Sequence, residues 1–267
     1  MTFDFIQKYI DKTRVFFKEK AKKTRSFFTE NSFACDACGG EIFDYPVHRL
    51  CSDCEGKMRR NIGRVFPKCG RKTVAEGVCL ACKSNLPKFT YGFSPFVYRG
   101  ETASLINRIK NGMPILASYF GEEMAEYFLI KYADHSALTT EEEVLVIPVP
   151  LTETREKERG YNQATELAEA FVRRLRERGY TATVDLEILQ KSRETAQQKH
   201  MDYQARRENV SGAFHVHKRN ACKGRRLVLI DDIMTTGATG SECADRLLHA
   251  GAKEVLFIVG ASLPERK

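Results

Sequence analysis

The sequence contains no apolar run approaching the ~20 residues that a membrane-spanning helix needs. Charges interrupt its first residues, so it also lacks the apolar core of a secretory signal peptide. These two absences predict a cytoplasmic chain without a transmembrane segment. Tryptophan is missing too, but the composition is otherwise ordinary for a folded protein, and 267 residues suffice for one medium domain with a small appendage.

Two common nucleotide-binding motifs are also absent. No Gly-Lys-Ser/Thr follows the glycine of the most motif-like loop, which excludes a Walker A site. That loop carries only Gly237 and Gly240, which excludes the Gly-x-Gly-x-x-Gly fingerprint. No helix-turn-helix is recognisable either, which argues against a regulator that reads DNA sequence.

A strand followed by two carboxylates and a threonine-rich loop stands where those motifs are missing. The apolar residues 227–230 predict a buried parallel strand, and ligands of open α/β sheets bind beyond the carboxyl ends of such strands. Asp231 and Asp232 follow, and their oxygens can accept hydrogen bonds from the vicinal hydroxyls of a sugar. The following loop consists of Thr235, Thr236, Gly237, Ala238 and Thr239.

This loop precedes an expected helix at 240–250, so its amides form a site for an anion. Gly237 permits close approach of the backbone. Diol acceptors beside a phosphate site predict a binding site for a ribose 5-phosphate. Two alternatives stay open: a plain strand–turn–helix with solvated aspartates, and a carboxylate pair that binds Mg²⁺ without a nucleotide.

The rest of the chain alternates between expected strands and helices. Strands are predicted at 90–98, 144–149, 184–189, 227–230 and 255–259, and helices at 101–110, 116–131, 163–178 and 240–250. This order predicts an α/β fold, a mostly parallel sheet with helices on both faces. The polar segment 193–214 is consistent with a flap that closes over the site.

A second candidate loop, expected over 151–160, follows the strand at 144–149. Leu151 and Thr152 would present backbone amides, and Arg155 and Arg159 can bind phosphate oxygens, so this loop suits a pyrophosphate. The alternative is surface charge, because glutamates alternate with the arginines here.

Seven of the nine cysteines lie between Cys35 and Cys82. The first four, Cys35, Cys38, Cys51 and Cys54, form two Cys-x2-Cys knuckles, which can place four sulfurs around a structural Zn²⁺. The second group has only Cys69, Cys79 and Cys82, because Phe66 stands where a matching knuckle needs a cysteine. It can recruit His48, keep an open position or bind no metal, so a second zinc is doubtful.

The charge is unevenly distributed. Residues 1–90 hold 18 Lys/Arg and 10 Asp/Glu, whereas residues 91–267 hold 25 of each. A basic first third suggests contact with a polyanion such as single-stranded DNA, or a face that only keeps the protein soluble. Residues 1–32 read as a basic amphipathic arm, which can contact anionic lipid or DNA or pack on the protein. We therefore expect three parts: the arm at 1–32, a zinc-ribbon domain at 33–88 and the α/β domain at 89–267.

Several further motifs share the order of the cysteine knuckles and the Asp231–Asp232 loop. They are Phe96-x-Tyr98-x-Gly100, Ile109-Lys110, Val149-Pro150-Leu151, Arg155-x3-Arg159-Gly160-Tyr161-Asn162-Gln163, Arg193-x-Thr195-x2-Gln198 and Arg206-x2-Asn209-Val210-x-Gly212-Ala213-Phe214. The loop resembles the phosphoribosyl-pyrophosphate (PRPP) motif of type I phosphoribosyltransferases. The whole order, over roughly residues 33–262, resembles the ComF family of competence-associated proteins.

The resemblance implies a double zinc ribbon joined to a type I phosphoribosyltransferase fold, and an association with DNA uptake in natural transformation. The implied ligands are PRPP with Mg²⁺ at the site and structural Zn²⁺ in the ribbons. Three functions stay open: a competence factor with a PRPP-type site that contacts single-stranded DNA and the uptake machinery, a phosphoribosyltransferase that makes a nucleotide from a free base, and a non-catalytic PRPP sensor. No residue stands out as a catalytic base, and the sequence does not identify the acceptor or the oligomeric state.

Overall fold

The computed structural model describes residues 34–43, 49–73, 79–133, 142–194 and 203–264. Contacts divide the chain into two compact units, Met1–Glu55 and Gly56–Lys267, and each is described by itself. The predicted arm at 1–32 lies outside the described residues, and the predicted three-part division stays a prediction.

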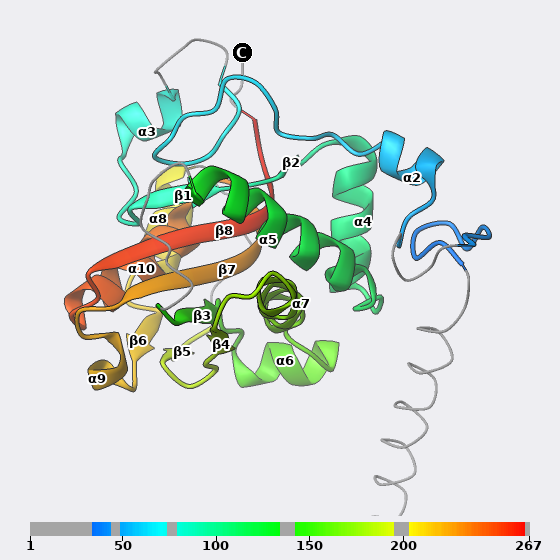
Figure 1. Cartoon of the computed structure of the whole chain (residues 1–267). Coiled ribbons are helices and arrows are strands. Elements are labelled where there is room, and N and C mark those ends of the chain that lie inside the picture. Colours follow the sequence, from blue (N-terminus) through cyan, green and yellow to red (C-terminus); the bar gives the residue numbers. More distant parts are fainter. Residues whose placement is uncertain (1–33, 44–48, 74–78, 134–141, 195–202, 265–267) are drawn as a thin grey trace, which may run out of the picture. The chain divides into compact units, whose positions relative to one another are not determined.

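The second unit is built on a parallel sheet. Its strand order is β1 (Tyr91–Phe93), β8 (Glu254–Ser262), β7 (Arg226–Met234), β3 (Val144–Pro148) and β4 (Ala182–Val184), and β2 (Phe96–Val97) also pairs with β8 (Figure 1). All of these pairings are parallel. β3 and β7 are buried apolar strands, as continuous apolar runs of this length predict.

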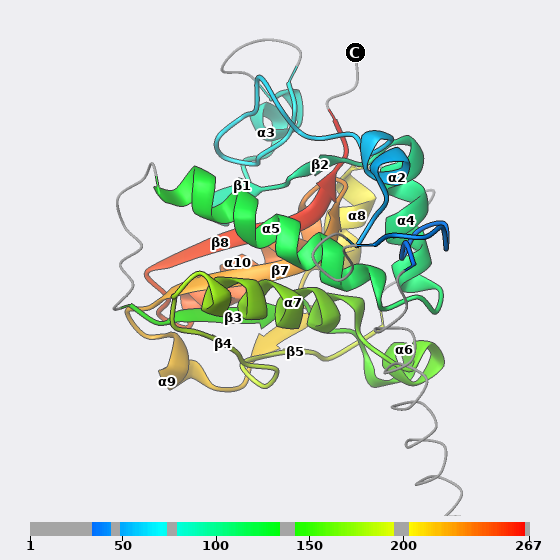
Figure 2. The same ribbon diagram turned by 45° about the vertical axis from the view of Figure 1, so that its right-hand side comes forward.

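Helices cover both faces of this sheet (Figures 1 and 2). α5 (Leu116–Ala133) and α7 (Gln163–Glu177) pack together on one face, where a Cβ on Gly121 would lie 2.5 Å from the Cβ of Ala170. α10 (Ala238–His249) packs on the opposite face, and its Leu247 shares a core with Leu229 of β7 and Phe257 of β8. The predicted fold class, a mostly parallel α/β sheet with helices on both faces, is confirmed.

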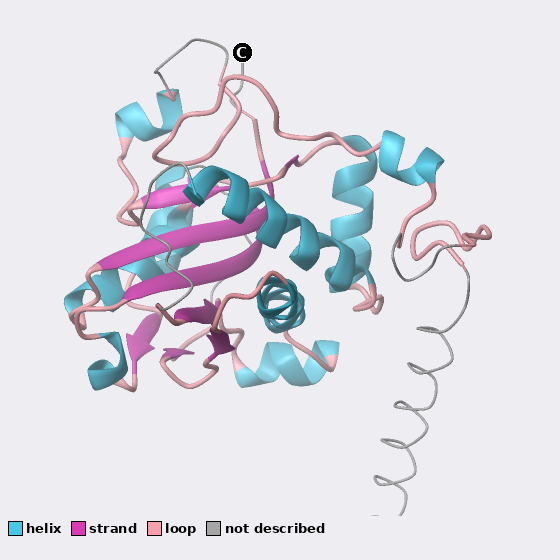
Figure 3. Cartoon of the chain, viewed as in Figure 1, coloured by secondary structure: helices cyan, strands magenta, loops and turns pink. Residues whose placement is uncertain are grey.

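The remaining elements surround this core. α4 (Gly100–Lys110) follows β2, α6 (Glu153–Arg159) follows β3, and β5 (Leu189–Lys191) pairs antiparallel with β6 (Phe214–Val216). Figure 3 draws the strands in magenta and the helices in cyan. The short helices are α2 (Ser52–Gly56), α3 (Leu80–Ser84), α8 (Tyr203–Val210) and α9 (Arg219–Cys222). Within the described ranges, no helix is both long and apolar enough to traverse a bilayer.

Three expectations about local structure were wrong. The expected loop at 151–160 contains α6, because Thr152 caps its first turn and Gly160, at φ +81°, ends it. The expected strand at 184–189 is divided between β4 and β5, because the Asp185 carboxylate accepts the amides of Glu187 and Ile188 and turns the chain. β7 continues past residue 230 to Met234, so Asp231 and Asp232 lie within the strand.

Candidate functional site

The carboxyl ends of β3 and β7 lie side by side in the middle of the sheet. The amide of Val149, just beyond β3, donates to the carbonyl of Ile230 at 2.8 Å. From β3 the sheet continues to β4, and from β7 it continues in the other direction to β8 and β1. Ligands of open α/β sheets bind at such a point, where the direction of connection reverses. The topology therefore brings the two predicted loops to one edge.

Asp232 is buried near this end of β7 and forms an ion pair. Its Oδ2 lies 2.9 Å from Nζ of Lys110, the last residue of α4. The Asp232 side chain is 6% exposed and the Lys110 side chain 25%. Burial opposes the charged form of Lys110, but the carboxylates of Asp232 and Asp231 outweigh it and raise the pKa of Lys110. The pair places a cation and a carboxylate side by side at this edge of the sheet.

The neighbouring carboxyl of Asp231 is in a different electrostatic state. Burial and the charge of Asp232 raise the pKa of Asp231 well above its usual value, although the amide of Asp232 donates to its Oδ1 at 2.8 Å. A group that brings positive charge or hydroxyl donors to these carboxylates relieves this repulsion. A sugar diol does so, and so does Mg²⁺, which prefers carboxylate oxygens.

The loop from Thr235 to Thr239 forms the turn into α10. Gly237 is the N-cap residue in the left-handed region, at φ +85°, and as a glycine it has no side chain to cap the helix. The hydroxyl of Thr236 accepts a hydrogen bond from the amide of Ala238 at 3.2 Å, while Thr235 and Thr239 are half-buried. The remaining amides of the first turn of α10 can attract an anion. The predicted carboxylates and the predicted loop therefore lie at consecutive positions along one edge.

The second predicted loop adjoins this edge. Leu151 is half-buried, and the hydroxyl of the buried Thr152 donates to the Glu194 carboxylate. Nε of Arg155 lies 3.7 Å from the same carboxylate. Arg159, the last residue of α6, instead donates to the side chain of Gln163 at 2.8 Å, the first residue of α7. Glu194 thus lies beside Arg155, one of the two arginines that the sequence assigns to a pyrophosphate, and binds the hydroxyl of Thr152.

Sequence reasoning missed three cations near this edge. Lys110 was noted only within the Ile109-Lys110 motif, and nothing local indicated its pairing with Asp232. Burial lowers the pKa of Lys191 in β5, and the charges of Glu194, Arg155 and Asp231 also act on it. Arg71 reaches the loop at Thr235 from the cysteine-rich segment. Of the expected flap, Arg193 donates to the carbonyl of Ser211 at 2.7 Å, while Thr195 and Gln198 lie outside the described residues.

The first cysteine group forms a compact cluster. The four sulfurs of Cys35, Cys38, Cys51 and Cys54 all lie within 4.8 Å of one another, and those of Cys38 and Cys51 are 3.7 Å apart. Tetrahedral thiolates on one Zn²⁺ have sulfurs about 3.8 Å apart. Burial opposes ionisation, but backbone amides outweigh it and lower the pKa of Cys35 to about 7. This donor set fits a metal ion.

The second group repeats the backbone of the first with one ligand missing. In the first knuckle the Cys35 amide donates to Gly40 and the Cys35 carbonyl accepts from Gly39. In the second, the Phe66 amide donates to Arg71 and its carbonyl accepts from Gly70. Phe66 therefore takes the position of Cys35. The sulfurs of Cys69, Cys79 and Cys82 still lie within 4.8 Å of one another, inside the core beneath α10.

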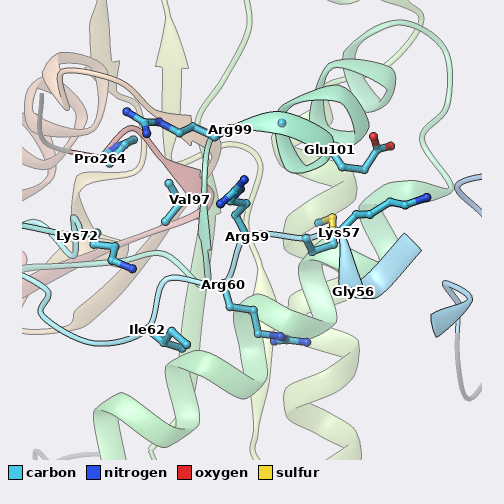
Figure 4. A pocket seen from close by; sticks show the side chains of 12 residues that line it. Gly56, Lys57, Arg59, Arg60, Ile62, Lys72, Val97, Arg99, Glu101 and Pro264 are labelled. Atoms are coloured by element: carbon cyan, nitrogen blue, oxygen red, sulfur yellow. The ribbon is translucent and has the colours of Figure 1, made fainter. Parts of the chain in front are cut away.

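A separate basic cavity of about 870 Å³ lies in the second unit (Figure 4). Its cations are Lys57, Arg59, Arg60, Lys72 and Arg99, opposed by Glu101. Arg60 pairs with Glu123 at 2.5 Å, but among the described residues no ion pair involves the other four cations. Met58, Ile62, Val97 and Pro264 supply apolar lining. We call this space the basic cavity.

Competence and DNA-utilisation proteins are similar to this chain. Competence protein ComFC of Bacillus subtilis is 27% identical over 225 residues, covering 77% of this chain and 80% of that protein. Competence protein F of Haemophilus influenzae is 28% identical, with coverages of 84% and 94%. DNA utilization protein YhgH of Escherichia coli K12 is 27% identical, with coverages of 77% and 87%. No family model matches.

Two solved structures share part of the architecture. The glutamine PRPP amidotransferase of B. subtilis, complexed with ADP and GMP, is 21% identical at a TM-score of 0.32, and this chain covers 25% of it. The hypoxanthine-guanine phosphoribosyltransferase of Leishmania tarentolae, in complex with GMP, is 14% identical at a TM-score of 0.31, with 65% covered.

Proposed function

We propose that this chain binds PRPP or another ribose 5-phosphate and acts in the handling of DNA during uptake. The role in DNA uptake is proposed because the chain resembles the ComF family, a resemblance that the competence and DNA-utilisation relatives confirm. The observation that carries the ligand proposal is the meeting of two features at the end of β7. The Asp231–Asp232 carboxylates lie immediately before the loop at the N-terminus of α10.

The proposed roles follow from the geometry of this edge. Asp231 and Asp232 accept the ribose hydroxyls, and Thr235–Thr239 receive the 5-phosphate with backbone amides. Thr152 and Arg155 hold the pyrophosphate once Glu194 releases them. Asp231 and Asp232 are also the carboxylates that would hold Mg²⁺, and the ion would supply positive charge that offsets the charge of the phosphates.

If the chain is a phosphoribosyltransferase, these groups position the ribose and stabilise the departing pyrophosphate as positive charge grows on the sugar. A non-catalytic PRPP sensor uses the same contacts without turnover.

Calorimetry with PRPP, ribose 5-phosphate and Mg²⁺ tests ligand binding. We expect Asp231→Asn/Asp232→Asn to weaken PRPP binding by about 1–3 kcal/mol, because hydroxyl groups then lose charged acceptors. Glu177→Gln, an exposed carboxylate at the end of α7, is the matched control. Equal PRPP affinity in the wild type and the double variant contradicts the site. Labelled PRPP incubated with a panel of free bases separates an enzyme, which releases pyrophosphate, from a sensor, which does not.

The basic cavity favours single-stranded DNA as a second ligand. Lys57, Arg59, Lys72 and Arg99 come from three segments of the second unit and surround one space (Figure 4). Phosphates need such cations, and the apolar lining provides surfaces against which bases can pack. The proposed DNA contact therefore includes these described residues in addition to the basic arm at 1–32.

Fluorescence anisotropy with a labelled oligonucleotide tests this second ligand. Arg59→Gln/Lys72→Gln removes two cavity charges and should lower the slope of log affinity against log salt by about 1.4. Lys223→Gln/Lys253→Gln, two exposed lysines at the amino ends of β7 and β8, is the charge-matched control. An unchanged slope in the cavity variant means that DNA does not bind there.

The cysteine clusters complete the proposal. Cys35, Cys38, Cys51 and Cys54 hold one structural Zn²⁺, for which the sulfur spacing is suitable. The three-cysteine group is a doubtful zinc site, because the fourth position is occupied by Phe66. Zinc binding and the folding of such a ribbon are coupled, so Cys51→Ser should unfold the first ribbon.

A further inference from the structure

Arg71 is a buried cation whose contacts within the described residues include no carboxylate. The residue is 5% exposed, and its Nε has no hydrogen-bond partner. Within the part of the chain that the structure describes, no aspartate or glutamate forms an ion pair with it. Burying a guanidinium is costly, so such a residue normally faces an anion or holds essential polar groups.

The backbone of Arg71 is fixed against the end of the sheet. A Cβ on Gly70 would lie 2.4 Å from the carbonyl oxygen of Gly92 in β1, and a Cβ on Gly92 would lie 2.7 Å from that of Cys69. The Asn61 side chain donates to the carbonyls of Gly70, at 2.7 Å, and Ser94, at 2.9 Å. Because two glycine backbones meet here, the turn before Arg71 has little freedom to shift.

From this anchored turn the guanidinium reaches the predicted phosphate loop. Nη2 of Arg71 donates to the carbonyl of Thr235, and it lies 3.8 Å from the position of a Cβ on Gly237. In a trans peptide the carbonyl and the following N–H point in opposite directions. Holding the Thr235 carbonyl toward Arg71 therefore aims the Thr236 amide away from it, to the other side of the loop.

We propose that Arg71 is a positioning residue for an anion that binds at this loop. The second cysteine-rich segment thus contributes a side chain to the α/β site. It fixes the peptide between Thr235 and Thr236 and contributes positive charge behind the loop. That the anion is the phosphate of a ribose 5-phosphate rests on the proposed function. The arrangement gives the second knuckle a role even without a bound metal: it holds Arg71 in place.

Amide exchange of the ligand-free full-length chain tests the positioning directly. Arg71→Met should raise exchange about tenfold or more over residues 235–239, because a hydrogen bond to a charged group is lost, and leave 227–230 unchanged. Arg64→Met removes an exposed guanidinium from the same segment and should change neither range. Unchanged exchange over 235–239 in folded Arg71→Met overturns the proposal.

Calorimetry with ribose 5-phosphate tests the consequence for binding. We expect about tenfold weaker binding in Arg71→Met, and Arg71→Lys to recover to within about threefold of the wild type because charge is restored. A purely structural role predicts a lower melting temperature with wild-type affinity, which also overturns the proposal. If Arg71→Met does not fold, Arg71→Gln replaces it in both measurements. If the wild type binds no ribose 5-phosphate, the proposed function fails, while the exchange experiment still decides the role of Arg71.

Discussion

The ion pair between Lys110 and Asp232 should be the strongest electrostatic contact at the candidate site. Lys110→Met removes the cation and leaves Asp232, 6% exposed, beside the second carboxyl of Asp231. Breaking a buried pair by removing one partner costs roughly 3–5 kcal/mol. Since a quarter of the Lys110 side chain is exposed, water offsets part of this cost, and we expect about 3 kcal/mol.

A double-mutant cycle separates the pair from other effects. Unfolding of the ligand-free protein in urea at pH 7 should give a coupling of about 2 kcal/mol for Lys110→Met with Asp232→Asn, because the double variant leaves neither member of the pair as a lone buried charge. The pair of Arg60 and Glu123, with side chains 43% and 22% exposed, is the control and should couple by less than about 1 kcal/mol. Effects at Lys110 and Asp232 that add to within about 0.5 kcal/mol would refute the reasoning.

The other predictions concern a carboxyl, a competing glutamate, a missing ligand and the arm. Asp231→Asn should be more stable than the wild type at pH 7. Because the pKa of Asp231 is raised in the folded protein, the stability of the wild type falls as the pH rises above the unfolded pKa of about 4. Urea unfolding of both proteins at pH 4 and pH 7 measures the difference in stability, which should vanish at pH 4. Glu194→Gln should bind pyrophosphate with Mg²⁺ about threefold to fivefold more tightly by calorimetry, since an exposed competing pair is removed. Phe66→Cys should raise the zinc content from one ion per chain to two by elemental analysis, and Phe66→Ser should not. Deleting residues 1–32 removes eight Lys/Arg and four Asp/Glu, so the salt dependence of DNA affinity should flatten while PRPP affinity is unchanged.

The order of elements in the α/β body was predictable from the sequence because its strands are buried on both faces. Apolar runs such as 144–149 and 255–259 have few alternatives to a parallel strand flanked by helices. The exact end of a strand is less determined. β7 includes Asp231 and Asp232 because pairing with Val259, Ala261 and Ser262 of β8 continues past the apolar run. An apolar pattern in the sequence indicates which residues are buried. It does not indicate where a strand ends, because backbone pairing can continue through polar residues whose side chains form hydrogen bonds or ion pairs.

The partners of the site residues were not predictable in the same way. Lys110 and Asp232 are far apart in sequence, and their meeting depends on where α4 ends relative to β7. Glu194 interacts with Thr152 and Arg155 because β5 brings its flanking segment to the end of β3. Within 151–160 glutamates alternate with basic residues, and one local pair, Lys157 with Glu153, forms at 3.4 Å. Local pairs follow from helical spacing, whereas contacts across the site require the topology.

The second cysteine group shows how a missing residue can conceal a repeat. With Phe66 in place of a cysteine, the spacing pattern was broken, and the group read as an incomplete site. The backbone nevertheless keeps the knuckle, since Phe66 makes the hydrogen bonds of Cys35 and the bridge between Val65 and Lys72 repeats that between Ala34 and Glu41. Phe66 packs against the core around Cys69 and α10, so apolar burial can stabilise there a turn that a metal organises in the first ribbon. A knuckle that is stabilised by packing stays formed whether or not a metal ion is bound. It can therefore hold Arg71 against the loop from Thr235 to Thr239 in either state.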